Sequence, residues 1–184
     1  KDWKDRHLAP EGEIVRVLGK THTPSAEFEA LLNNYHLTPH FPDPVISESE
    51  KIPSVIRKRD LKNRLDLREL YTFTVDPEDA KDFDDAISIE TLGSGDMKVG
   101  VHIADVSAYV RPGSALDREA QKRGNSTYLV GSVIPMLPQS LSNGICSLIE
   151  GEDRLTKTVF LTFSSSGQFK ASSFANTVIR SPFL

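Results

Sequence analysis

The sequence contains one cysteine, one tryptophan and no apolar run long enough to cross a bilayer. A lone cysteine cannot form an internal disulfide, and no Cys or His lies near it at zinc-finger spacing, so we expect Cys146 to be a small buried hydrophobe. The first residues, KDWKDRHLAP, are neither a signal peptide nor a lipidation signal. These absences exclude a disulfide-stapled secreted domain, and they predict a cytoplasmic protein with no membrane partner.

The composition is typical of a folded protein with one sizeable core. Of the 184 residues, 38% are hydrophobic and 26% are charged. The net charge of −4 counts mildly against a nucleic-acid partner, because phosphate binders usually carry excess Lys and Arg. The acids are concentrated, however: residues 76–85 contribute −5, which leaves +1 for the remainder. That remainder includes the basic stretch IRKRDLKNR, which we interpret as a solvated linker rather than a phosphate-contacting strip.

The first 64 residues predict one strand, one helix and a connector. GEIVRVLGK, residues 12–20, is rich in Val and Ile and predicts a single strand whose sheet partners lie upstream. Ser25 is a plausible N-cap for an amphipathic helix with apolar residues at helical spacing, namely Phe28, Leu31, Leu32 and Tyr35. Four prolines follow between residues 38 and 58, and they favour short helices and turns over one long element.

From residue 65 onward the pattern changes to strands. YTFTV alternates polar and apolar residues, and so do AISIE and MKVGVHI on either side of the turn GSGD. SALDREAQKRG predicts a helix capped by Ser114 and Asp117 and stopped by Gly124. Two further strands are expected in residues 157–179. The prediction is an α+β fold, a mainly antiparallel sheet with flanking helices, preceded by the single strand at 12–20.

The stretch TVDPEDAKDFDDAISIE places six carboxylates in residues 76–85. Like charges repel, so such a cluster must be solvated, protonated or neutralised by cations. In an extended chain Asp82 and Asp84 lie on one face and Asp85 lies on the opposite face. A turn at Pro77 can bring Asp76 close to them. Hard carboxylate oxygens of this kind suit Mg²⁺ or Mn²⁺.

Two alternatives to a magnesium site were weighed. An EF-hand fits poorly, because the sixth residue counted from Asp76 is Lys81, where that loop needs Gly. A solvated acidic turn is the plain alternative, but Phe83 inside the cluster and the Ile- and Val-rich flanking strands favour a turn anchored to a core. His102 and Asp105 do not predict a catalytic pair, since a satisfied or solvent-facing strand residue is the commoner role of such a histidine.

Three stretches resemble the ribonuclease II (RNB) family in its bacterial ribonuclease R branch. They are APEGEIVRVLGK, LDLRELYTFTVDPEDAKDFDDAISIE and the long run VGVHIADVSAYVRPGSALDREAQKRGNSTYLVGSVIPMLPQSLSNGICSL. The resemblance implies a 3′-to-5′ exoribonuclease that acts on the 3′ end of single-stranded RNA. It also implies hydrolysis that depends on Mg²⁺, with Mn²⁺ as a possible substitute, and that releases nucleoside 5′-monophosphates.

The resemblance also implies the site residues. The family's aspartates occur as D-x5-D-x-D-D, which falls here on Asp76, Asp82, Asp84 and Asp85 as catalytic and metal-binding residues, with Asp84 indispensable. The family's base-stacking tyrosine corresponds to Tyr128, for which the residues alone would favour a half-buried aromatic following a helix.

The resemblance further implies a division of the chain. Residues 1–20 correspond to the end of a cold-shock (OB) domain, 21–64 to a helical connector, and 65–184 to the first half of the RNB domain. The family's second half supplies an arginine and a glutamate, and an S1 domain usually follows, so we expect this sequence to be part of a longer exoribonuclease. Two other functions remain open: an RNA-binding module without cleavage, and a structural domain that binds divalent metal such as Ca²⁺.

Overall fold

The computed structural model describes residues 12–77 and 80–182. Its contacts divide the chain into two compact units, Lys1–His40 and Phe41–Leu184. None of the helices in the described ranges is long and apolar enough to span a bilayer. The predicted division into 1–20, 21–64 and 65–184 stays a prediction.

The first unit contains the helix α1 (Pro24–Asn34). The predicted helix is confirmed, but its cap is Thr23 rather than Ser25, and the Thr23 hydroxyl accepts a hydrogen bond from the backbone N–H of Ala26. Pro24 occupies the first helical position, where its missing N–H removes no hydrogen bond, so the helix begins before the expected serine.

The strand predicted at residues 12–20 is not formed. These residues belong to no strand, and Ile14, Val15 and Val17 are 85%, 93% and 81% exposed. A strand needs a neighbour to pair its backbone N–H and C=O groups, and no segment within 12–77 and 80–182 pairs with this one. Its apolar residues therefore have no sheet face to pack on.

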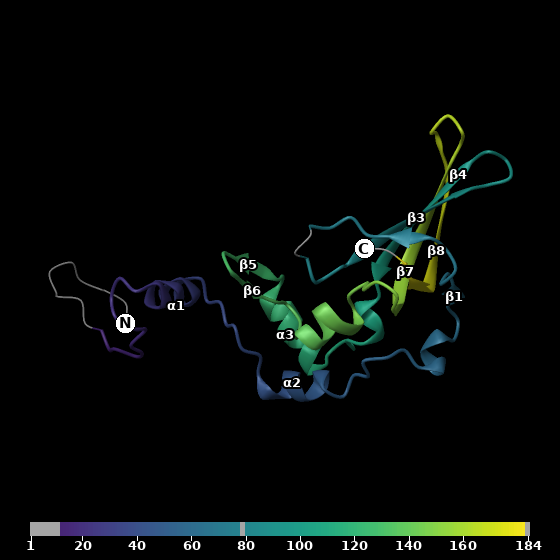
Figure 1. Ribbon diagram of the computed structural model, residues 1–184. Coiled ribbons are helices and arrows are strands. Elements are labelled where there is room, and N and C mark those ends of the chain that lie inside the picture. The colour runs from purple at the N-terminus through teal and green to yellow at the C-terminus, as the bar shows by residue number, and fades with distance from the viewer. Residues whose placement is uncertain (1–11, 78–79, 183–184) are drawn as a thin grey trace, which may run out of the picture. The chain divides into compact units, whose positions relative to one another are not determined.

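The second unit is built on a six-stranded sheet (Figure 1), which confirms the predicted α+β fold with a mainly antiparallel core. The strands lie in the order β1-β8-β7-β4-β3-β2, in which only the short β1 pairs in parallel, with β8. The hairpin predicted around GSGD is present. The two strands expected in residues 157–179 also pair with each other as a hairpin. The strand bounds are β1 (Leu65–Asp66), β2 (Thr72–Phe73), β3 (Asp85–Thr91), β4 (Met97–Ala104), β7 (Asp153–Phe163) and β8 (Phe169–Arg180).

Short helices and a small hairpin complete this unit. The helix α3 (Ala115–Arg123) begins and ends as predicted: the Ser114 hydroxyl accepts from the N–H of Asp117, and Gly124 ends the helix at a φ of 79°. The other elements are α2 (Asp43–Ser49), η1 (Lys58–Leu61), η2 (Val106–Ala108), the π-helical η3 (Leu141–Ile145) and the hairpin of β5 (Thr127–Leu129) with β6 (Ser132–Ile134).

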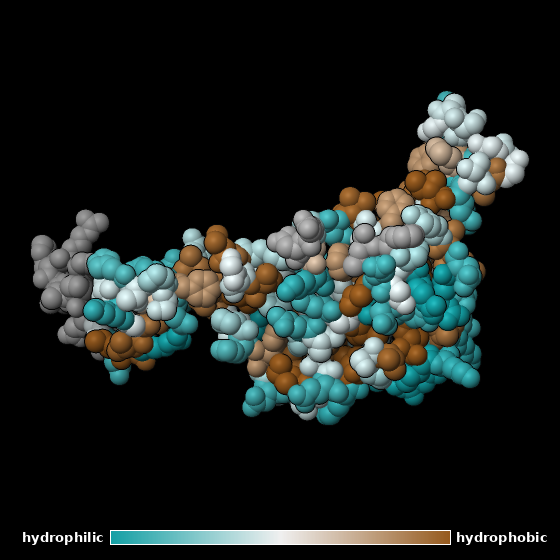
Figure 2. Space-filling model, in the orientation of Figure 1, coloured by the Kyte–Doolittle hydropathy of each residue, from teal (hydrophilic) through white to brown (hydrophobic). Residues whose placement is uncertain are grey.

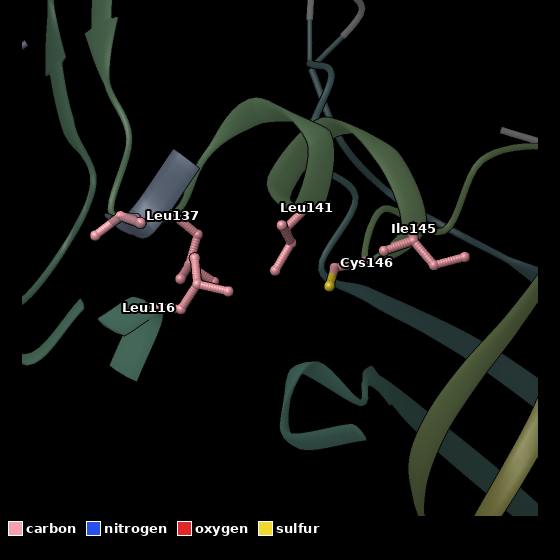
Figure 3. Packing of buried hydrophobic residues seen from close by; sticks show 6 residues of the cluster. Leu116, Leu137, Leu141, Ile145 and Cys146 are labelled. Atoms are coloured by element: carbon pink, nitrogen blue, oxygen red, sulfur yellow. The ribbon is translucent and has the colours of Figure 1, made fainter. Parts of the chain in front are cut away.

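The helices pack around an apolar cluster (Figure 3). Leu116 of α3 and Leu141 of η3 are completely buried in it, and Val45 of α2 joins them. Cys146 belongs to the same cluster, and burial raises the pKa of its thiol to about 12. The expectation that Cys146 acts as a small buried hydrophobe is confirmed.

The buried face of the sheet is unusually polar. The buried polar residues of this face in β3, β4, β7 and β8 are Ser88, His102, Arg154, Thr156, Thr158 and Thr177. The opposite face is apolar and partly exposed, with Ile89 56% and Phe174 78% exposed. Figure 2 shows apolar surface near the β3–β4 and β7–β8 hairpins, which project beyond the body of the unit.

A buried ion pair ties the start of β1 to the centre of the sheet. Arg64 Nη2 lies 2.6 Å from Asp105 Oδ2, and the two side chains are 11% and 2% exposed. The other terminal nitrogen of Arg64 donates to the carbonyl oxygens of Thr156 and Thr177, both at 3.3 Å. The basic stretch is therefore no purely solvated linker, because its last residue belongs to the core.

Removing one partner of this pair should strongly destabilise the fold. We expect Arg64→Met to lower the free energy of unfolding by about 3 kcal/mol, because Asp105 would remain buried with less compensation for its charge. Urea denaturation followed by circular dichroism measures this. The control is Lys170→Met, which breaks a pair between Asp96 and a half-exposed lysine and should cost about 1 kcal/mol or less. Equal losses in the two variants would contradict the assignment.

Candidate functional site

The four aspartates lie between the end of β2 and the start of β3. Asp76 follows β2, Asp82 and Asp84 precede β3, and Asp85 is the first residue of that strand. The strand ladder reaches this segment, since the N–H of Ala104 donates to the carbonyl oxygen of Asp84 at 2.9 Å. The acidic segment is therefore attached directly to the central hairpin.

The electrostatics of the segment centre on Asp84. Partial burial raises the pKa of its carboxyl group, and the charges of Asp82, Asp85 and Asp76 raise it further, in that order. No basic side chain in the described ranges forms an ion pair with any of these four aspartates. The structure thus brings four like charges within electrostatic range without neutralising them.

This donor set fits a hard divalent cation in its chemistry. Carboxylate oxygens are the preferred protein ligands of Mg²⁺ and Mn²⁺, and a cation would relieve the repulsion felt by Asp84. Among the described residues, no three His, Cys, Asp or Glu side chains are already gathered closely enough to hold a metal ion. The assignment of the four aspartates as metal ligands stays a prediction.

Tyr128 lies next to the acidic segment, although 46 residues separate it from Asp82. It occupies the middle of β5, its side chain is 64% exposed, and its hydroxyl donates to Asp82 Oδ2 at 2.5 Å. This hydrogen bond is the main cause that raises the pKa of Tyr128 to about 12. The ring is exposed rather than half-buried, so its face is accessible to a partner.

Apolar packing anchors the segment, as the presence of Phe83 suggested. Phe83 is partly buried against the cluster formed by Ala86, Ala104, Leu148 and Ile179. The N–H of Leu148 donates to the Phe83 carbonyl oxygen at 2.9 Å. Residues 147 and 148 support the site, although nothing in LSNGICSL predicts which distant segment they contact.

His102 lies in the core on β4, opposite Ala86 of β3. It is fully buried, its Nδ1 lies 2.8 Å from Thr158 Oγ1, and its Nε2 lies 2.9 Å from Ser88 Oγ. Gly100 leaves room for this arrangement, since a Cβ there would lie 2.4 Å from Ser88 Oγ. The expectation that His102 is a strand residue with satisfied hydrogen bonds is confirmed.

Comparison with known families identifies the class of fold. The model of the RNB domain matches residues 64–182, and that of the cold shock domain matches residues 1–42. Because the RNB match covers more than half of the chain, the protein belongs to the RNB family.

The more particular similarity is to ribonuclease R. The chain is 51% identical to ribonuclease R of Thermotoga maritima, over 94% of this chain and 24% of that protein. It is 42% identical to ribonuclease R of Chlamydia trachomatis, over 98% of this chain and 26% of that protein. The chain thus spans about a quarter of the length of these curated relatives.

Solved structures agree with this similarity. RNase R of Mycoplasma genitalium, in complex with ribose-methylated single-stranded RNA, matches with a TM-score of 0.84 and 32% identity, over 91% of this chain and 26% of that one. Yeast Ssd1, described as a pseudonuclease, matches with a TM-score of 0.74 and 22% identity, over 91% of this chain and 22% of that one. The second match shows the fold alone.

Burial of His102 makes a pH dependence testable. Desolvation lowers its pKa from the ordinary 6.5 to about 4. The unfolded chain therefore binds more protons than the folded chain between these values, so the stability present above pH 6.5 falls as the pH drops toward 4. We expect this residue to account for a loss of up to about 3 kcal/mol.

Two measurements check this expectation. NMR titration of the His102 ring should give a midpoint near 4 rather than 6.5. The difference in unfolding free energy between pH 7 and pH 4.5 should shrink in His102→Gln, which removes the titrating ring. A His102 midpoint near 6.5 in the folded chain would contradict the burial argument.

Proposed function

We propose that this chain forms part of the catalytic region of a 3′-to-5′ exoribonuclease, which hydrolyses RNA in a metal-dependent reaction and releases nucleoside 5′-monophosphates. One observation carries the proposal. The spacing D-x5-D-x-D-D occurs within the stretch that matches the RNB domain, and its four carboxylates act electrostatically on one another at Asp84. The similarity to ribonuclease R supports the exoribonuclease class.

The proposed partner is the 3′ end of single-stranded RNA. A structural relative, RNase R of Mycoplasma genitalium, is described in complex with single-stranded RNA. The net charge of this chain is −4, so phosphate attraction by the chain as a whole is weak. We propose that cations held by the aspartates and stacking on Tyr128 provide the contacts to RNA, and that the reaction takes place in the cytoplasm.

Asp76, Asp82, Asp84 and Asp85 would hold Mg²⁺, for which Mn²⁺ can substitute. When bound, such ions polarise a phosphodiester and lower the pKa of a coordinated water. The chain's own contribution is to present these carboxylates at the start of the β3–β4 hairpin. Asp84 is central in this respect, because partial burial and the charges of the other three aspartates disfavour its ionised form.

Tyr128 is proposed to stack on the terminal base. Its ring is exposed, and the hydrogen bond from its hydroxyl to Asp82 keeps it beside the carboxylates. Stacking on an aromatic ring tolerates any base, which suits an enzyme that removes nucleotides one after another. A base on this ring would place the adjoining phosphate near the aspartates.

The alternative is an RNA-binding module that does not cleave. The same fold occurs in yeast Ssd1, which is described as a pseudonuclease, and fold alone does not determine activity. The resemblance assigns an arginine and a glutamate of the active site to sequence outside this chain. Activity tests are therefore made on a full-length RNB protein that carries these residues.

Replacing Asp84 should separate cleavage from binding. In a full-length RNB protein that carries these residues, we expect Asp84→Asn to reduce cleavage of 5′-labelled single-stranded RNA by at least about a hundredfold, because one proposed metal-binding carboxylate is lost. RNA affinity should persist, since the substitution also removes a negative charge. Asp96→Asn, which changes a carboxylate paired with Lys170 outside the segment, serves as the control. Cleavage by Asp84→Asn near the unmodified rate would refute the assignment.

Replacing Tyr128 should change the length of the final product. We expect Tyr128→Ala to stop digestion at a longer RNA, because the contact to the terminal base is lost. Tyr128→Phe keeps the ring but loses the hydrogen bond to Asp82, and it should give a product close to the original length. Denaturing gel electrophoresis of 5′-labelled RNA resolves the difference. An unchanged product pattern in Tyr128→Ala would argue for a purely structural tyrosine.

A further inference from the structure

The acidic segment carries carboxylates that repel one another, and it depends on contacts with other segments to keep its conformation. Residues 80–84 precede the regular ladder of β3, and they carry aspartates whose charges repel. The ladder reaches only Asp84, so residues 80–83 need other partners to hold the like charges close together. Those partners come from residues 147 and 148, more than 60 positions further along the chain.

The hydroxyl group of Ser147 bonds to both sides of Asp82. Ser147 Oγ accepts a hydrogen bond from the N–H of Phe83 at 3.0 Å and donates one to the carbonyl oxygen of Lys81 at 3.1 Å. A serine hydroxyl offers one donor hydrogen together with acceptor lone pairs, so a single side chain can make both bonds. The backbone before and after Asp82 is therefore held by one atom.

Ser147 is itself held firmly. Its side chain is completely buried, and its carbonyl oxygen accepts a hydrogen bond from Arg154 Nε at 2.6 Å. Arg154 is 6% exposed and belongs to β7, at the centre of the sheet. The N–H of Leu148 adds a third bond, to the carbonyl oxygen of Phe83. Ser147 thus connects the acidic segment to β7 through Arg154.

We propose that Ser147 is a positioning residue, which fixes the backbone around Asp82 so that the carboxylates of the acidic segment can share a divalent cation. This inference rests on the proposed function for its cation, while the hydrogen-bonded arrangement stands on the contacts alone. Alanine at this position would remove the partner of both the Phe83 N–H and the Lys81 carbonyl, in a partly buried setting. The segment would then spread under its own charge.

The first measurement uses the unmodified chain. Hydrogen exchange followed by NMR should show the Phe83 amide protected, although it lies outside any strand. In Ser147→Ala we expect this amide to exchange about tenfold faster. The matched control is Ser49→Ala, which removes another buried hydroxyl, one that lies in α2 and donates to the Ile46 carbonyl oxygen. An unprotected Phe83 amide in the unmodified chain would overturn the inference, even if Ser147→Ala failed to fold.

The second measurement is Mn²⁺ binding by isothermal titration calorimetry. We expect Ser147→Ala to bind Mn²⁺ about tenfold more weakly than the unmodified chain, and Ser49→Ala to bind it equally well. Ser147→Thr keeps the hydroxyl and should recover part of the affinity. Equal Mn²⁺ affinity in Ser147→Ala and the unmodified chain would overturn the positioning role. Absence of Mn²⁺ binding by the unmodified chain, with the Phe83 amide protected, would refute the metal site while supporting the hydrogen-bonded clamp.

Discussion

The hydrogen-bonded network on the buried face of the sheet is the constraint on which the rest of the structure depends. Ser88, His102, Thr158 and Thr177 are linked side chain to side chain, and Arg64 joins the network through the Thr177 carbonyl. Burying polar groups costs little free energy only when they form hydrogen bonds with one another. The network therefore links β3, β4, β7 and β8 across the buried face of the sheet.

The acidic segment makes use of this rigidity. Its carboxylates repel one another, so the segment stays in place only because the core supplies bonds to it: Ala104 to Asp84, Leu148 to Phe83, and Ser147 to both sides of Asp82. Partial burial and the neighbouring charges both disfavour the ionised form of Asp84. Under the proposed function, a divalent cation would offset this cost.

Local signals were good guides to the elements. Ser114 and Gly124 mark the ends of α3 because capping depends on residues within one turn, and the alternating strands were recognised for a similar reason. The predictions failed where the outcome depends on contact with a second, distant segment. The strand predicted at 12–20 found none among the described residues, and in β2 the threonine at position 72 is buried while Tyr71 is 58% exposed. Alternation shows that a strand has two faces but not which face is covered.

The sequence by itself determined the spacing of the aspartates, the helix caps, the hairpin turns and the family resemblance, because each of these is written in short stretches of neighbouring residues. Only the tertiary structure decided that Tyr128 bonds to Asp82, that Arg64 is buried against Asp105, and that Ser147 holds the acidic segment. These contacts join positions 46, 41 and 64 residues apart. Such pairs meet only when the strands between them have paired and packed, and no local pattern encodes that distance.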